Sequence, residues 1–241
     1  MADGEAPKNS DLRARTISAV VMVAVAGLAL WLGGWIWTLL VVAIGLGVLV
    51  EWTRLYLAFA HSFPARVAWA LGGSLYIAVA CLTLVLLRHE GAGAVLFPVA
   101  IVIATDVGAY FTGRRFGGPK IAPAISPSKT WSGLGGGMAA SALVAVLPAL
   151  IWYEDHPASL LLLLCGIGVA AAVAAQAGDF FESWMKRRAG VKDSGKLIPG
   201  HGGLFDRVDG LLAVCFTIGM LMLGTLVLAL ARGESLLPSP A

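Results

Sequence analysis

The chain has 241 residues, of which 59% are hydrophobic and 13% are charged, and its formal net charge is +3. Because soluble domains contain about a quarter charged residues, this composition excludes an ordinary soluble protein and indicates a polytopic membrane protein. Residues 1–15 are polar and are expected to form a disordered cytoplasmic tail, and residues 233–241 a second short tail. Residues 16–232 are expected to form a single membrane-embedded domain.

Seven apolar runs, separated by Gly, Pro or charged residues, predict an all-α fold in which a polytopic helix bundle crosses the membrane about seven times. Eight or nine crossings are the alternative. The first run has only 16 residues, whereas a membrane-spanning helix usually needs about 20. The predicted spans are residues 17–32, 35–52, 67–87, 94–116, 133–152, 160–177 and 211–230.

The basic residues are distributed unevenly among the segments that connect these runs. If the N-terminus is cytoplasmic and the chain crosses seven times, all of the 17 Lys and Arg residues except Arg88 and Arg232 face the cytoplasm. Cytoplasmic loops of membrane proteins carry such an excess, so the bias supports this orientation. It also places the polar segments 114–130 and 186–209 on the same side, where both can contribute to one site.

Two acidic residues occur within or at the end of these apolar runs. Glu51 lies at the end of the second run, and we expect it to pair with Arg54 at the membrane interface. Asp106 lies inside the fourth run, where a charged side chain costs about 2.5–3.5 kcal/mol on insertion scales. Asp106 is therefore expected to face the bundle interior, either in a functional role or in a structural hydrogen bond.

Residues 117–130 contain three prolines and cannot form a regular helix. Hydroxyl and ammonium groups are concentrated at the end of this loop, at Ser126, Ser128, Lys129 and Thr130. Such groups suit phosphate oxygens, so the segment is either a phosphate-contacting loop or a solvated turn.

The polar segment 176–210 combines three features that suit phosphate chemistry. Asp179, Glu182 and Lys186 are spaced to share one face of a helix, and Asp206 and Asp209 form a second carboxylate pair. Carboxylates suit hard divalent metal ions, clustered cations suit phosphate, and glycines let backbone N–H groups approach an anion. The cations and glycines between the carboxylates are Lys186, Arg187, Arg188, Lys192, Lys196, Gly202 and Gly203, with His201 beside them. A metal-dependent phosphoryl or nucleotidyl transfer site is thus predicted, with a solvated loop as the alternative.

The order of residues in this segment resembles the signature of the phosphatidate cytidylyltransferase family, also called CDP-diacylglycerol synthases. The run Ser183-Trp-Met-Lys-Arg is followed by Lys192-Asp-Ser-Gly and then by residues 197–209, without a departure from the signature. The Ser-Pro-Ser-Lys-Thr run at 126–130 is similar to a second segment of the family. The resemblance is firm over residues 176–210, looser over 105–132 and weak in the first hundred residues. We call residues 176–210 the signature segment.

The resemblance implies an enzyme that transfers the cytidylyl group of CTP to phosphatidate, giving CDP-diacylglycerol and pyrophosphate in phospholipid biosynthesis. It implies a multi-pass protein of the cell membrane, a lipid bilayer around it, an active site on the cytoplasmic side, a homodimer and no nucleic-acid partner. It also implies Mg²⁺ held by Asp179 and Asp206, with room for a second cation. The catalytic residues it implies are Asp179, Asp206, Lys186, Arg207 and Asp209. The expected substrate-binding residues are Ser126, Ser128, Lys129, Arg187, Lys192, Asp193, His201, Gly202, Gly203, Asp106 and Glu182.

Two other classes of function have to be distinguished from this one. A membrane CTP-dependent lipid kinase needs similar cations and metal, but it releases CDP rather than pyrophosphate. A channel or transporter could use the intramembrane carboxylate Asp106, but the dense cationic loop would repel cations. The D-G-x-x-A-R pattern of CDP-alcohol phosphotransferases does not occur in this sequence.

Overall fold

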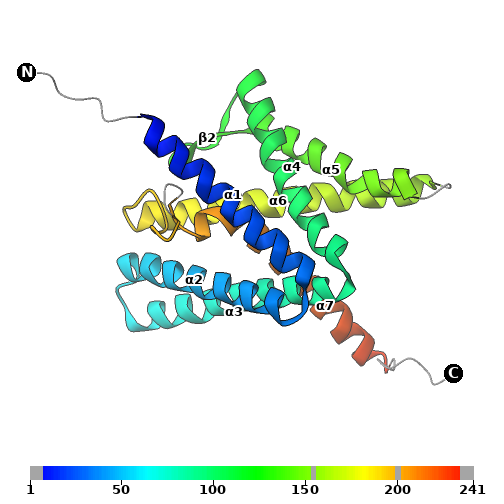
Figure 1. Cartoon of the computed structure of the whole chain (residues 1–241), viewed down its shortest axis with the longest axis horizontal. Helices are drawn as coiled ribbons and strands as arrows, with labels where there is room; N and C mark the ends of the chain where they lie inside the picture. Colours follow the sequence, from blue (N-terminus) through cyan, green and yellow to red (C-terminus); the bar gives the residue numbers. More distant parts are fainter. Residues whose placement is uncertain (1–7, 153–155, 199–201, 234–241) are drawn as a thin grey trace, which may run out of the picture.

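The computed structural model describes residues 8–152, 156–198 and 202–233, and within these ranges it contains seven helices and one small hairpin (Figure 1). Each predicted apolar run lies in one helix. The helices are α1 (Lys8–Leu32), α2 (Gly34–Phe59), α3 (Phe63–Glu90), α4 (Ala92–Phe116), α5 (Trp131–Trp152), α6 (Ala158–Arg188) and α7 (Phe205–Ala231). The strands of the hairpin are β1 (Lys120–Ala122) and β2 (Ser126–Thr130).

Six of these helices, α2 to α7, are long and apolar enough to cross a membrane. The apolar part of α1 covers only residues 16–32, as its short predicted span indicated. α1 begins at Lys8, so its first two turns fall within residues 1–15, which we expected to be a disordered tail. Large apolar side chains on the outer faces of the helices are exposed, as hydrocarbon surroundings require; examples are Leu46, Leu71 and Leu162. A polytopic helical bundle is therefore confirmed.

Several helices extend beyond the apolar runs that predicted them. α2 continues to Phe59, α6 continues to Arg188, and α7 begins at Phe205 rather than at residue 211. Hydropathy marks only the part of a helix that is apolar on all sides, so it misses turns that carry a charged face. The added turns place the carboxylates of the signature segment on helix ends rather than in a loop.

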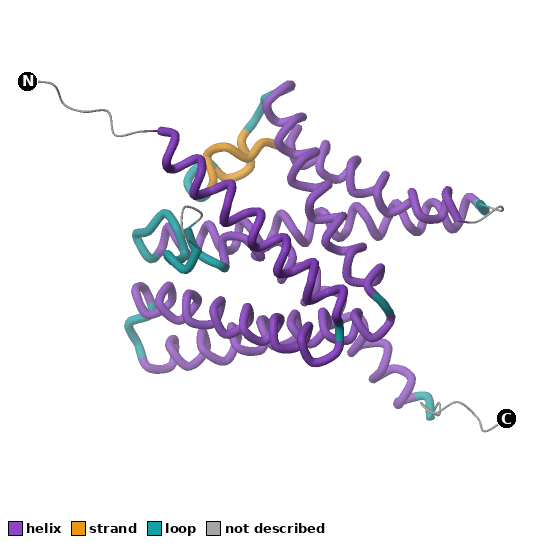
Figure 2. Tube along the Cα trace, viewed as in Figure 1, coloured by secondary structure: helices purple, strands orange, loops and turns teal. Residues whose placement is uncertain are grey.

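The loop at 117–130 forms a hairpin, which corrects the all-α description at this one place. β1 and β2 pair antiparallel, with Lys120 opposite Thr130 and Ala122 opposite Ser126. The prediction that this segment cannot be a regular helix is confirmed. The strands and the loop of the signature segment lie at the same end of the bundle (Figure 2).

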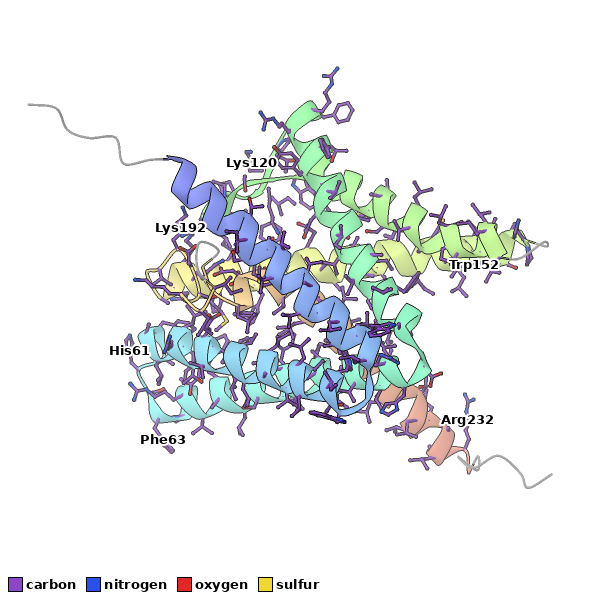
Figure 3. All side chains as sticks on the ribbon, in the orientation of Figure 1. His61, Phe63, Lys120, Trp152, Lys192 and Arg232 are labelled. Carbon is purple, nitrogen blue, oxygen red and sulfur yellow. The ribbon has the colours of Figure 1, made fainter. Side chains whose placement is uncertain are left out.

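Side chains in Figure 3 mark the two ends of the bundle. Lys120 and Lys192 lie at the end that also carries His61, and Trp152 and Arg232 lie at the opposite end. The two polar segments are thus on one side of the bundle, as the distribution of basic residues predicted.

Close helix packing holds this end together. α4 and α5 approach so closely that a Cβ atom on Gly108 would lie 2.6 Å from the Gly136 carbonyl oxygen. Thr105 on α4 and Ser141 on α5 share a buried hydrogen bond of 2.6 Å. Glycine and hydroxyl side chains of this kind allow close backbone contact between membrane helices. The contact fixes α4, and with it Asp106, against the helix that follows the hairpin.

Replacing Gly168 of α6 by Ala should destabilise the bundle by about 1–3 kcal/mol, because the new methyl group overpacks a tight contact. Its Cβ atom would lie 2.6 Å from the Ser141 carbonyl oxygen of α5. The matched control is Gly166→Ala, on the same helix, where nothing lies within 4 Å of the added atom. Thermal unfolding in detergent should distinguish the two variants. Equal melting temperatures would contradict the close α5–α6 contact.

Candidate active site

A cavity of about 450 Å³ lies between α4, the hairpin, the start of α5 and α6. Residues of the 126–130 segment and of α6 both line it, so the two polar parts of the sequence meet at one cavity. The polar lining consists of Asp106, Tyr110 and Arg114 of α4, of Lys120, Ser128, Lys129 and Thr130 of the hairpin, and of Gln176 and Asp179 of α6. Three cations and two carboxylates thus line a single cavity.

An ion pair joins the hairpin to α6 at this cavity. Lys129 Nζ lies 2.5 Å from Asp179 Oδ2, and the Ser183 hydroxyl donates to Asp179 Oδ1 over 3.2 Å. The Lys129 ammonium also lies 4.5 Å from the centroid of the Phe180 ring, a cation–π contact. The ammonium is mostly buried, with 15% of the Lys129 side chain exposed. These contacts hold a positive charge at the cavity wall.

Hydrogen bonds fix the hairpin above α5 and α6. The Thr130 hydroxyl accepts a bond of 3.1 Å from the Gly133 N–H, which satisfies a donor in the first turn of α5. Arg187 Nε of α6 donates to the Ile125 carbonyl oxygen over 3.3 Å. Both contacts connect residues on either side of Lys129 to a helix end. They therefore restrict where the Lys129 side chain can lie.

A second polar cluster joins α6 to α7, next to the cavity. Lys186 Nζ donates to Glu182 Oε2 and to Asp206 Oδ1, both over 2.6 Å. The side chains are largely buried, with 1% of Glu182, 8% of Asp206 and 12% of Lys186 exposed. The prediction that Glu182 and Lys186 share a helix face is confirmed, and Lys186 connects that face to Asp206 at the start of α7.

Asp206 also holds the loop between α6 and α7. Its Oδ2 atom accepts three hydrogen bonds, from the Ser194 N–H and the Ser194 hydroxyl, each 2.9 Å, and from the Gly203 N–H at 2.8 Å. Hydrogen bonds to an ionised acceptor are stronger than neutral ones. One carboxylate thus fixes both sides of the loop and pairs with Lys186.

The other predicted site residues surround these two clusters. Asp209 lies one turn after Asp206 on α7, and its Oδ1 accepts from the Gly210 N–H over 2.8 Å. Gly202 has φ +82°, a left-handed conformation that glycine adopts without strain, and its carbonyl accepts from the Ile198 N–H. Arg187, Lys192, Asp193 and Arg207 are exposed at this end of the bundle. Ser126 is paired with Ala122 in the hairpin, outside the cavity lining. His201 lies outside the described residues.

Carboxylate oxygens are suitable ligands for a hard divalent cation such as Mg²⁺. Within the described ranges, no three His, Cys, Asp or Glu side chains lie together as a complete metal site. Mg²⁺ commonly takes only one or two carboxylates and fills its remaining positions with water and substrate phosphates. Asp179 borders the cavity, and the buried Glu182 Oε1 next to Asp206 has no hydrogen-bond partner among the described residues. Carboxylates of this type suit a Mg²⁺ ion shared with a bound polyphosphate, with Asp179 at the cavity and Asp206 in the neighbouring cluster, outside the cavity lining.

Sequence reasoning assigned Glu51 to the wrong partner. We expected it to pair with Arg54 at the membrane interface, whereas its carboxylate is fully buried and accepts hydrogen bonds from Ser194, Leu204 and Phe205. α2 continues past residue 51 for two more turns, so Glu51 lies inside the bundle. Its partners are at least 143 residues away in the sequence, and no local pattern indicates them.

Comparisons with known proteins match most of the chain. A model of the cytidylyltransferase family matches residues 63–225, a range that includes the hairpin and the whole signature segment. A phosphatidate cytidylyltransferase from Brucella suis biovar 1 (strain 1330) is 36% identical over 252 aligned residues, covering 85% of this chain and 90% of the relative. One from Rickettsia typhi (strain ATCC VR-144 / Wilmington) is 34% identical over 203 residues, covering 82% and 86%.

Proposed function

The chain belongs to the cytidylyltransferase family, and we propose that it transfers the cytidylyl group of CTP to phosphatidate. The products are CDP-diacylglycerol and pyrophosphate. The observation that carries this proposal best is the 2.5 Å ion pair between Lys129 and Asp179, because it joins the two family segments at one cavity. Cations and carboxylates from distant parts of the chain are thus placed where a charged substrate can meet both.

The reaction requires two anionic phosphates to approach each other. An oxygen of the phosphatidate phosphate attacks the α-phosphorus of CTP, and the bond to the pyrophosphate leaving group breaks. Arg114, Lys120 and Lys129 line the cavity, and their positive charges reduce the repulsion between the substrates. Lys186 is held between two carboxylates at the neighbouring cluster, so its ammonium has a fixed position.

No general base is needed for the attack. A phosphate monoester has a second pKa near 6 and is largely dianionic at neutral pH. The attacking oxygen therefore carries a negative charge before it reaches the enzyme. The chain has to bind, orient and neutralise the two substrates, and the ion pairs described above suit that task.

We propose that Asp179 and Asp206 hold Mg²⁺, which when bound would neutralise charge on the triphosphate and on the leaving pyrophosphate. The support is the chemistry of the donor set. Asp179 borders the cavity, and Asp206 Oδ1 accepts a hydrogen bond from Lys186 in the neighbouring cluster. Asp106, Glu182 and Asp209 are proposed to support these two, either by hydrogen bonding or at a second cation.

The location of the cavity suits a lipid substrate. Residues of the cavity and of the second cluster lie toward the ends of helices that are otherwise apolar, and we infer that these ends lie near the depth of lipid headgroups. Phosphatidate can therefore present its phosphate while its chains stay in the bilayer. We propose that this end faces the cytoplasm, because the connecting segments there carry most of the basic residues. The homodimer stays a prediction, which light scattering of the detergent-solubilised protein can test.

The proposed reaction can be tested by following the α-phosphate of CTP. Purified protein with phosphatidate, Mg²⁺ and CTP labelled at the α-phosphate should move the label into the lipid phase and release pyrophosphate. Label that stays in water while CDP accumulates would instead indicate a lipid kinase. A chelator should abolish the transfer, and added Mg²⁺ should restore it.

A further inference from the structure

Glu51 of α2 is a buried acidic residue that the proposed reaction does not use. Its side chain is fully buried, and its two carboxylate oxygens accept three hydrogen bonds. Oε1 accepts from the Leu204 N–H over 3.0 Å, and Oε2 accepts from the Phe205 N–H over 2.8 Å and from the Ser194 hydroxyl over 2.9 Å. A buried carboxylate is tolerated only when it is well bonded, and here every donor belongs to the signature segment.

Two of these donors lie at the N-terminus of α7. Leu204 is the residue before the helix and Phe205 is its first residue, and Leu204 has no side chain that can cap the helix. The first N–H groups of a helix lack partners within it, and a negative charge there is favourable. Glu51 therefore supplies, from a helix far away in the sequence, the cap that α7 does not provide for itself.

Two glycines of the signature segment make room for this carboxylate. A Cβ atom on Gly195 would overlap Glu51 Oε1, and one on Gly203 would overlap the Ser194 hydroxyl and lie 2.7 Å from Glu51 Oε2. Any larger residue at these positions would displace the carboxylate or the loop. The glycines thus fit the backbone of the signature segment around Glu51.

Ser194 connects Glu51 to the Asp206 cluster. Its hydroxyl oxygen lies 2.9 Å from Glu51 Oε2 and 2.9 Å from Asp206 Oδ2, and the two carboxylates share its single proton, so the hydroxyl donates to one of them at a time. Asp206 follows directly after Phe205, whose N–H is bonded to Glu51. The orientation of the Asp206 carboxylate toward Lys186 therefore depends on two groups that Glu51 holds.

We propose that Glu51 is a positioning residue, which caps α7 and fixes Ser194 so that Asp206 faces Lys186 in the arrangement needed for cytidylyl transfer. This inference rests on the proposed function. Glu51 acts through the loop and does not touch the substrates. Its effect should therefore appear in the turnover number and not in the apparent affinity for CTP.

The variant that tests this is Glu51→Gln, which keeps the size of the side chain but turns one acceptor oxygen into a donor NH₂ group. That group would face the Leu204 N–H or the Phe205 N–H, so one backbone donor loses its partner. We expect kcat to fall about 10–100-fold while KM for CTP changes less than about threefold. Hydrogen–deuterium exchange of the backbone amides at 203–206 should become faster in the same variant.

Trp37→Phe is the matched control. It removes another buried hydrogen bond of α2, the 3.1 Å bond from Trp37 Nε1 to the Leu84 carbonyl oxygen, at a distance from the signature segment. It should lower stability but leave kcat and the exchange of amides 203–206 close to those of the wild type. An equal loss of kcat in both variants would overturn the positioning role, as would a Glu51→Gln variant with wild-type kcat and exchange.

Ser194→Ala provides a second route if Glu51→Gln folds poorly. It removes the hydroxyl that links the two carboxylates but leaves Glu51 bonded to both backbone donors. We expect a loss of kcat, and we expect the double variant to lose much less than the product of the two single losses. Independent, multiplicative losses would overturn the proposal. Because amide exchange does not require turnover, a chain that failed to make CDP-diacylglycerol would still test the contact itself.

Discussion

Replacing Asp206 by Asn should lower kcat for cytidylyl transfer by roughly 10²–10³-fold, which is the largest effect that the structure predicts for a change of one functional group. Asp206 has two tasks that need both of its oxygens. Oδ2 accepts from the Ser194 and Gly203 N–H groups and shares the Ser194 hydroxyl proton with Glu51, and Oδ1 pairs with Lys186. An Asn side chain has one oxygen, so its NH₂ group would face either the loop donors or the Lys186 ammonium.

The measurement is initial-rate kinetics with label from CTP, together with a titration of Mg²⁺. If Asp206 also contributes to the metal site, the Mg²⁺ concentration that gives half-maximal rate should rise in the variant. Glu90→Gln is the control, because Glu90 is an exposed carboxylate at the opposite end of the bundle, at the end of α3. An Asp206→Asn variant that keeps more than a tenth of the wild-type rate would contradict this role.

Those parts of the fold that depend on local pattern could be predicted from the sequence. Apolar runs located every helix, because a membrane-spanning helix must be apolar over most of its length. The spacing of Glu182 and Lys186 predicted a shared helix face, and they form an ion pair of 2.6 Å. The distribution of basic residues predicted that the hairpin and the signature segment share one end, and Lys129 contacts Asp179 there.

The features that sequence reasoning missed depend on contacts between distant residues. Glu51 looks like an interfacial acid beside Arg54 because the apolar run ends there, and only the longer α2 places its carboxylate inside the bundle. Gln176 and Tyr110 line the cavity, although neither was expected to contact a substrate; Gln176 only opens the signature segment, and Tyr110 lies in an apolar run. Burial of this kind is decided by which helices pack together, and hydropathy along the chain does not contain that information.

Replacing Lys129 by Met should lower kcat/KM for CTP by about 10–100-fold, because a charged hydrogen-bond donor is lost from the cavity wall. The ion pair with Asp179 cannot explain a loss of that size through stability. The Asp179 side chain is 35% exposed, and ion pairs that reach solvent contribute about 0–1 kcal/mol. Lys129→Arg keeps the positive charge and should retain more activity than the Met variant. A Met variant within about threefold of the wild type would contradict a role in substrate binding.

A double variant, Lys129→Met with Asp179→Asn, separates binding of substrate from neutralisation of Asp179. If Lys129 served only to neutralise the carboxylate, removing both charges would restore activity, because replacing both members of an ion pair is often harmless where removing one is not. If the ammonium binds phosphate, and Asp179 contributes to catalysis through its own charge, the double variant should be no more active than Lys129→Met. We expect the second result. The melting temperatures of Lys129→Met, Lys129→Arg and the double variant should all be close to that of the wild type. Recovery of activity in the double variant would show that the ion pair is structural. The positive charges that bind CTP would then be those of Lys120 and Arg114, which line the same cavity.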